Sequence, residues 1–155
     1  MNDSNVSVCI RSSAGTSPDR RTLARRAGKM LKALGRPDDE LSILICSDRE
    51  IKRLNHQYRK RPRATNVLSF GQLATNKKLP DAPVIIGDVV ISAQTADRES
   101  RRMSISLLKH VTWLLAHGIL HLYGHRHESE ADENIMQKKT LDLAKKACEP
   151  VRRKG

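Results

Sequence analysis

The chain has 155 residues and a formal net charge of +12, with 38% hydrophobic and only 3% aromatic residues. This length suits one domain with an aliphatic core, and neither a membrane-spanning apolar run nor a secretory signal is visible, so we expect a cytoplasmic protein without a membrane partner. The positive excess favours a polyanionic partner, most simply nucleic acid, with a solvated basic surface as the alternative. Because stacking aromatics are scarce, phosphate contacts are the expected mode of binding.

The chain opens with a predicted strand, helix and second strand. Residues 6–10 have strand character. Ser17 and Pro18 are typical of an N-cap and a first helical residue, and Gly35 is placed to end that helix. Residues 41–46 form a continuous apolar run, which predicts a buried strand.

A second helix and a basic loop follow. Ser47 and Glu50 have the spacing of a capping box, which predicts a helix that begins there. The inward face of this helix is expected to consist of Ile51, Leu54 and Tyr58. The dense basic run 59–63 lies at the end of the helix, and Pro62 makes the next segment irregular.

The remaining elements are two strands and three helices. Residues 65–70 and 84–92 predict strands, the second with a bulge at Gly87. Ser92 can cap a helix that runs to about Arg102, and a helix rich in histidine follows it. The acidic run 128–133 begins a last helix, in the orientation that complements the helix dipole.

The segment 104–127 contains five of the six histidines and is the centre of the chain. Its apolar residues recur at helical spacing, so it predicts an amphipathic helix. His117 and His121 are four residues apart and project from one face of that helix. Gly124 can adopt a positive φ and end the helix, after which the chain can bring His127 back towards the same point.

Three converging imidazoles suit Zn²⁺, which takes neutral nitrogen ligands in a tetrahedron and leaves the fourth position to water in catalytic sites. His117, His121 and His127 have the spacing of the metzincin motif HxxxHxxGxxH. That motif carries a general-base Glu directly after its first His, where this chain has Gly118. His110 and His125 are alternatives as substitute ligands or as groups that support the ligands.

Four strands and about five helices predict an α+β fold in one domain, with a small mixed four-stranded sheet and a central metal-binding helix. We expect the domain to span residues 1–150 and residues 151–155 to form a disordered basic tail.

Three motifs together resemble the YbeY family of bacterial endoribonucleases. They are HGILHLYGHRH and, upstream of it, LNHQYRKRPRATNVLSF and GDVVIS, so the resemblance runs from about Leu41 to His127. It implies a zinc-dependent, single-strand-specific endoribonuclease domain that acts in maturation of the 3′ end of 16S rRNA and in ribosome quality control. By position, the family's ligands fall on His117, His121 and His127, and its functionally important arginine falls on Arg59.

The resemblance also implies one Zn²⁺ per chain and RNA as the partner, in the form of the rRNA precursor and the small ribosomal subunit. Ribosomal proteins or a ribosome-associated GTPase are the candidate protein partners, and no DNA is expected. The chain departs from the family in one place, since His125-Arg126 replaces the usual Tyr-Asp before the third histidine. That change exchanges a carboxylate for a cation near the metal.

Two other functions compete with this hypothesis. A metallopeptidase would share the metal ligands, but Gly118 and the positive charge argue against it. A non-catalytic RNA-binding factor of ribosome biogenesis would use zinc as a structural element, although an open fourth position favours catalysis. For RNA cleavage, both a metal-bound water and the 2′-hydroxyl of the substrate are candidate nucleophiles.

Overall fold

The computed structural model describes residues 5–11, 18–73, 79–125 and 129–150. Its four-stranded sheet has the order β1-β2-β4-β3, in which β1, β2 and β4 are parallel and β3 is antiparallel to β4. The strands are β1 (Val6–Ile10), β2 (Glu40–Cys46), β3 (Val67–Gly71) and β4 (Ile85–Ser92). The described helices are α1 (Arg20–Ala33), α2 (Asp48–Arg59), α3 (Ala93–Arg102), α4 (Leu107–Leu122) and α5 (Glu130–Cys148). The predicted α+β fold with a mixed sheet is thereby confirmed.

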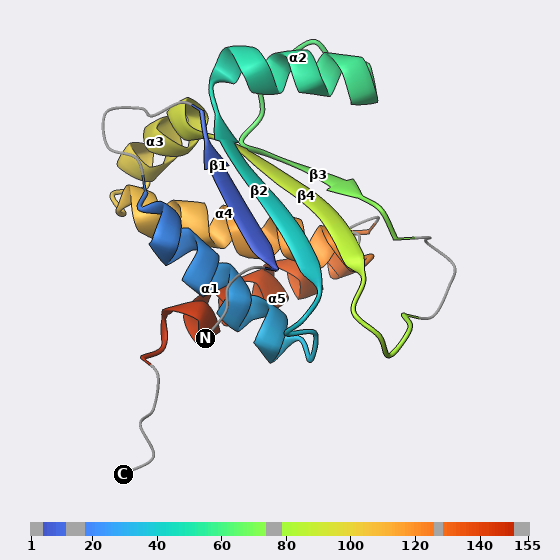
Figure 1. Cartoon of the computed structure of the whole chain (residues 1–155). Coiled ribbons are helices and arrows are strands. Elements are labelled where there is room, and N and C mark those ends of the chain that lie inside the picture. Colours follow the sequence, from blue (N-terminus) through green and yellow to red (C-terminus); the bar gives the residue numbers. More distant parts are fainter. Residues whose placement is uncertain (1–4, 12–17, 74–78, 126–128, 151–155) are drawn as a thin grey trace.

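The two faces of the sheet carry unequal cores. In Figure 1, α1, α4 and α5 lie on one side of the sheet and α2 lies on the other. Val89 and Ile91 of β4 belong to the large core beneath the sheet, whereas Val90 joins the small core under α2, because side chains alternate along a strand. Since α4 is buried along most of its length, it forms the centre of the larger layer.

Most helix starts follow the sequence signals, and one differs. The Ser47 hydroxyl accepts from the Glu50 amide at the start of α2, and Ser92 caps α3 in the same way. The first helix begins at Arg20 with Asp19 as its N-cap residue, two residues later than the expected first residue Pro18. Its expected cap, Ser17, lies outside the described residues.

Two further expectations have opposite outcomes. The bulge predicted at Gly87 is present, because the pairing of β2 with β4 shifts there and Gly87 has a φ of 134°. A Cβ at Gly87 would lie 2.1 Å from the Phe70 carbonyl oxygen, so only glycine fits. Tyr58, expected to face inward, is 62% exposed, and Asn55 is buried instead. Only one side of α2 therefore packs onto the sheet.

Within the described ranges, no single helix is long and apolar enough to cross a membrane. Helices α3 and α4 reach that length and composition only as a pair, which is bent by 116°.

Candidate functional site at the β3 edge of the sheet

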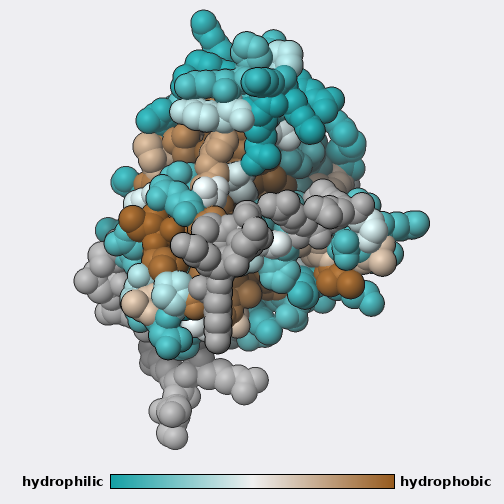
Figure 2. All heavy atoms as spheres, turned by 90° about the vertical axis from the view of Figure 1, so that its right-hand side faces the viewer, coloured by the Kyte–Doolittle hydropathy of each residue, from teal (hydrophilic) through white to brown (hydrophobic). Residues whose placement is uncertain are grey.

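A groove of about 910 Å³ opens along the edge strand β3. One wall is the end of α2 with the segment 61–66, and the other is the C-terminal half of α4. The view in Figure 2 looks onto this side of the molecule, where the hydrophilic surface of α2 lies above exposed hydrophobic side chains. Strand β3 therefore separates groups that reach the groove from opposite faces of the sheet.

Two of the three expected ligands meet in this groove. The Nε2 atoms of His117 and His121 lie 3.0 Å apart, and their rings meet edge to face with centroids 4.5 Å apart. One helical turn separates the two residues, which is why both project from the same face. The third expected ligand, His127, lies outside the described residues. Within the described part of the chain, no third His, Cys, Asp or Glu completes a cluster that could hold a metal.

The turn that precedes His127 has the expected form. Gly124 has a φ of 91°, its amide donates to the His121 carbonyl oxygen, and the His125 amide donates to the Leu120 carbonyl oxygen. These two bonds close the end of α4 around a glycine in the left-handed conformation.

His110 has a supporting position rather than a ligand's position. Its Nε2 lies 2.9 Å from Glu99 Oε1, and the same carboxylate accepts from the Asn66 amide at 3.1 Å. Trp113 stacks nearly parallel on both histidine rings, with centroid distances of 6.4 Å to His110 and 5.1 Å to His117. The indole therefore fixes the orientation of the His117 ring, a contact that the histidine spacing alone did not reveal.

Gly118 has a packing role that explains the missing glutamate. A Cβ at this position would lie 2.7 Å from Val89 Cγ1, and the Ser69 hydroxyl donates to the Gly118 carbonyl oxygen at 3.0 Å. Position 118 thus points into the sheet, where α4 approaches β3 and β4 closely. A glutamate there would enter the core instead of the groove, so the geometry of this helix has no place for a peptidase base.

Arg59, the last residue of α2, crosses the edge of the sheet into the groove. Its Nη2 donates to the Ser69 carbonyl oxygen at 2.6 Å, and its guanidinium carbon lies 5.8 Å from the centre of the Phe70 ring. Lys60 ends the helix with a φ of 56°, which turns the chain towards β3. The buried Asn55 holds this turn, because its side-chain amide donates to the Arg63 carbonyl oxygen at 3.0 Å.

The charge of the groove is one-sided. Its described lining includes Arg59, Arg61 and Arg63, and no Asp or Glu is among the described lining residues. Cations gathered without acids repel one another, and an anionic ligand would relieve that repulsion. Phosphate groups match this arrangement, because the planar guanidinium fork donates two parallel hydrogen bonds to their oxygens.

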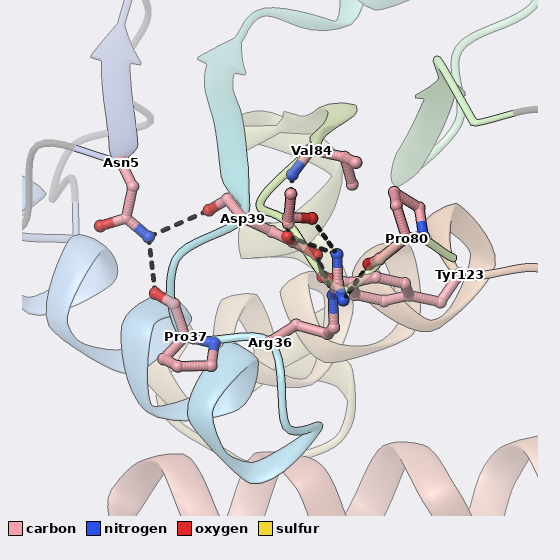
Figure 3. Close-up of polar contacts among 8 residues, drawn as sticks. Asn5, Arg36, Pro37, Asp39, Pro80, Val84 and Tyr123 are labelled. Carbon is pink, nitrogen blue, oxygen red and sulfur yellow. Dashed lines mark hydrogen bonds and ion pairs between the residues drawn. The ribbon is translucent and has the colours of Figure 1, made fainter. Parts of the chain in front are cut away.

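A buried polar cluster around Asp39 lies at the C-terminal end of α4 (Figure 3). Asp39, 1% exposed, accepts from Arg36 Nε at 2.7 Å and Nη2 at 2.9 Å, from the Tyr123 hydroxyl at 2.7 Å and from the Val84 amide at 3.0 Å. Burial opposes the charge of Asp39, but these bonds outweigh it and lower the pKa of the carboxyl. Burial and the hydrogen bond to Asp39 raise the pKa of Tyr123. Tyr123 lies directly before Gly124, so the cluster anchors the turn that leads to His127.

Comparison with known proteins agrees with this architecture. A family model described as endoribonuclease YbeY matches residues 12–147. The chain is 45% identical over 125 residues to endoribonuclease YbeY of Anaeromyxobacter dehalogenans. The match covers 81% of this chain and 63% of that relative, so the chain spans less than two thirds of the relative's length. It is 41% identical over 123 residues to endoribonuclease YbeY of Geobacter metallireducens, covering 78% of this chain and 81% of that protein.

A solved structure is also similar. The solution structure of TM1509 from Thermotoga maritima matches with a TM-score of 0.63 over 96% of this chain and 99% of that one, and its 20% identity makes this a likeness of fold alone. The family model spans most of the chain and the curated relatives share its sequence at 41–45% identity, so the chain belongs to the endoribonuclease YbeY family.

Proposed function

We propose that this chain is a zinc-dependent, single-strand-specific endoribonuclease that acts on the rRNA precursor of the small ribosomal subunit. Its roles are maturation of the 3′ end of 16S rRNA and ribosome quality control, in the cytoplasm. The observation that carries the proposal is the groove, in which Arg59 and a pair of converging histidines face one another across β3 with no acid in the described lining. Family membership supports the choice of RNA as the substrate.

The two described histidines fit a zinc ion. Two nitrogens bound to one tetrahedral zinc at 2.0–2.1 Å are about 3.3 Å apart, and the Nε2 atoms of His117 and His121 are 3.0 Å apart. His127 would be the third ligand, after the turn at Gly124. When bound, zinc polarises a phosphoryl oxygen and lowers the pKa of a bound water to about 7.

The chain's own residues position the RNA. Arg59 approaches the groove from α2 and is exposed, so it can hold the scissile phosphate with its fork while its neighbours Arg61 and Arg63 bind adjoining phosphates. Trp113 holds the His117 ring in place by stacking on it. The hydrogen bond from the Ser69 hydroxyl to the Gly118 carbonyl oxygen holds α4 against β3, and the bond from Arg59 to the Ser69 carbonyl oxygen joins the end of α2 to the same strand.

The test is cleavage of RNA by the purified chain with measured metal content. We expect about one Zn²⁺ per chain, cleavage of a single-stranded RNA, little cleavage of the same sequence in a duplex, and loss of cleavage in His117→Ala. Zinc and RNA binding without cleavage would favour the non-catalytic biogenesis factor. Digestion of casein that a chelator stops would favour a peptidase and contradict the proposal.

A further inference from the structure

Two of the four aromatic residues of this chain lie together beside the groove. The sequence contains one Trp, two Tyr and one Phe. Tyr58 of α2 and Phe70 of β3 pack with ring centroids 5.3 Å apart and planes inclined by 63°. Tyr58 is 62% exposed, the largest fraction among the exposed large hydrophobic side chains of the described residues. An aromatic ring is therefore held open to solvent in a chain that has few of them.

The position of this pair links it to the phosphate site. Tyr58 directly precedes Arg59, and the Arg59 guanidinium lies over the Phe70 ring while it donates to the Ser69 carbonyl oxygen. The pair thus comes from α2 and β3, two of the elements that form the groove. Tyr58 and the Arg59 guanidinium both contact the Phe70 ring, so a phosphate bound by Arg59 would lie close to the Tyr58 ring.

The ring geometry leaves a surface for stacking. In an edge-to-face contact one ring presents only its edge, so at least one face of Tyr58 is not covered by Phe70, whichever ring presents the edge. Phe70 is half-buried and packs on the small core under α2, so it supports the tyrosine from a fixed position. An aromatic ring with an open face is the kind of surface on which the bases of single-stranded nucleic acid stack.

We propose that Tyr58, supported by Phe70, stacks on one unpaired base of the RNA next to the phosphate held by Arg59. This inference rests on the proposed function. Every base has a π-face, so the contact is tolerant of sequence, but in a duplex both faces of a base are covered by its neighbours. Tyr58 therefore selects single strands, whereas Arg59, Arg61 and Arg63 bind the phosphates of either form.

The experiment measures the affinity of the full chain for a short single-stranded RNA and for the same RNA with one abasic nucleotide at each position in turn. At one position, the wild-type chain should lose about 5- to 150-fold in affinity, the range for one stacked base. Tyr58→Leu should bind the intact RNA as weakly as the wild type binds that abasic RNA, and should be insensitive to the abasic site. Tyr58→Phe should restore both the affinity and the sensitivity.

The controls separate the inference from the proposed function. His56→Ala changes an exposed residue of the same helix and should leave both affinities unchanged. If the wild type binds and cleaves RNA but Tyr58→Leu binds intact and abasic RNA as the wild type does, the stacking role is wrong and Tyr58 belongs to another surface, such as one for a protein. If the wild type neither binds nor cleaves RNA, the proposed function is wrong and the inference with it.

Discussion

Two clusters of charged side chains lie along the second half of α4, and they differ in how their charges are matched. Around Asp39, the carboxylate is buried and accepts from Arg36, Tyr123 and the Val84 amide. Around Arg59, cations gather in an open groove with no Asp or Glu in the described lining. The Asp39 carboxylate is matched within the chain, whereas no described residue of the groove lining supplies an acid to match its arginines, a charge that an anionic ligand would bring.

The difference separates groups that stabilise the fold from groups held ready for a ligand. A buried carboxylate is tolerated only when its hydrogen bonds are made, and Asp39 makes them with partners from three separate segments. Exposed like charges destabilise the compact state, so a groove with this lining is retained at some cost in stability. Both clusters share α4, because Tyr123 lies two residues after His121. The Asp39 cluster therefore holds the C-terminal end of α4, the helix that presents His117 and His121 to the groove.

The largest effect is expected for the metal ligands. His121→Ala removes one of two converging nitrogens, so the variant should retain almost none of the roughly one Zn²⁺ per chain that we expect in the wild type. Metal analysis after dialysis measures this directly. His56→Ala, which changes an exposed residue of α2, serves as the control and should keep the zinc. Full zinc content in His121→Ala would remove this residue from the site.

The second effect concerns Arg59. Because this side chain is exposed and its hydrogen bond is to a single carbonyl oxygen, Arg59→Ala should leave zinc content and thermal stability nearly unchanged. Cleavage of bound RNA should nevertheless fall by at least ~100-fold, the scale for loss of one positioned electrostatic group. Arg59→Lys should recover only part of it, since a point charge cannot reproduce the planar fork.

Neighbouring cations are the matched controls for Arg59. Alanine variants of Lys60, Arg61 and Arg63 should weaken RNA binding modestly and leave the chemical step alone. Single-turnover kinetics at saturating protein distinguishes the two cases. Cleavage by Arg59→Ala at the wild-type rate would show that Arg59 is one more basic surface residue.

The third effect concerns the contribution of the Asp39 cluster to the stability of the fold. Asp39→Asn keeps the shape of the side chain but removes its charge, and should lower the free energy of unfolding by about 2 kcal/mol at neutral pH, within the range for a hydrogen bond to a charged group. The folded-state pKa of Asp39 lies below its ordinary value of 3.8. Its contribution is therefore fully present above pH 3.8 and is lost as the pH falls through the folded-state pKa.

Denaturant unfolding of the wild type and of Asp39→Asn, from neutral to acidic pH, measures this contribution. The difference in stability between the wild type and Asp39→Asn should be constant at neutral pH and should shrink in acid. An equal difference at every pH would mean that the charge of Asp39 contributes nothing. Zinc content and RNA cleavage of the folded variant test how far the anchor of Tyr123 supports the metal turn.

Local patterns in the sequence predicted one cluster much better than the other. The spacing of His117 and His121 and the glycine turn at Gly124 depend on a single helix and its end, so helical geometry alone places them. The Asp39 cluster was not predicted, because its partners are far apart in the chain, 84 residues in the case of Tyr123. Only the sheet order brings these segments together.

The errors in the prediction have a similar cause. Tyr58 follows Ile51 at helical spacing and was expected to face inward, yet α2 covers the sheet mainly through Ile51 and Asn55, and its last turn reaches the edge strand. The role of Gly118 was also hidden, because a missing glutamate says nothing about the valine that would collide with it. Periodicity identifies an apolar face but not the width of the surface that covers it.

The smallest effect tests the positive charge of the groove lining. If Arg59, Arg61 and Arg63 each neutralise one phosphate of a single strand, the affinity for RNA should fall with a logarithmic salt slope of about −2, or roughly tenfold or more between 50 and 200 mM salt. Arg61→Ala should reduce the slope by about 0.7, because one fewer counterion is released. Asp39→Asn should leave the slope unchanged, since its charge is already matched inside the fold.

Fluorescence anisotropy over this salt range measures all three slopes. A slope near zero for the wild type would mean that the groove does not bind phosphates, and a slope that Arg61→Ala leaves intact would place the phosphate contacts on another basic surface.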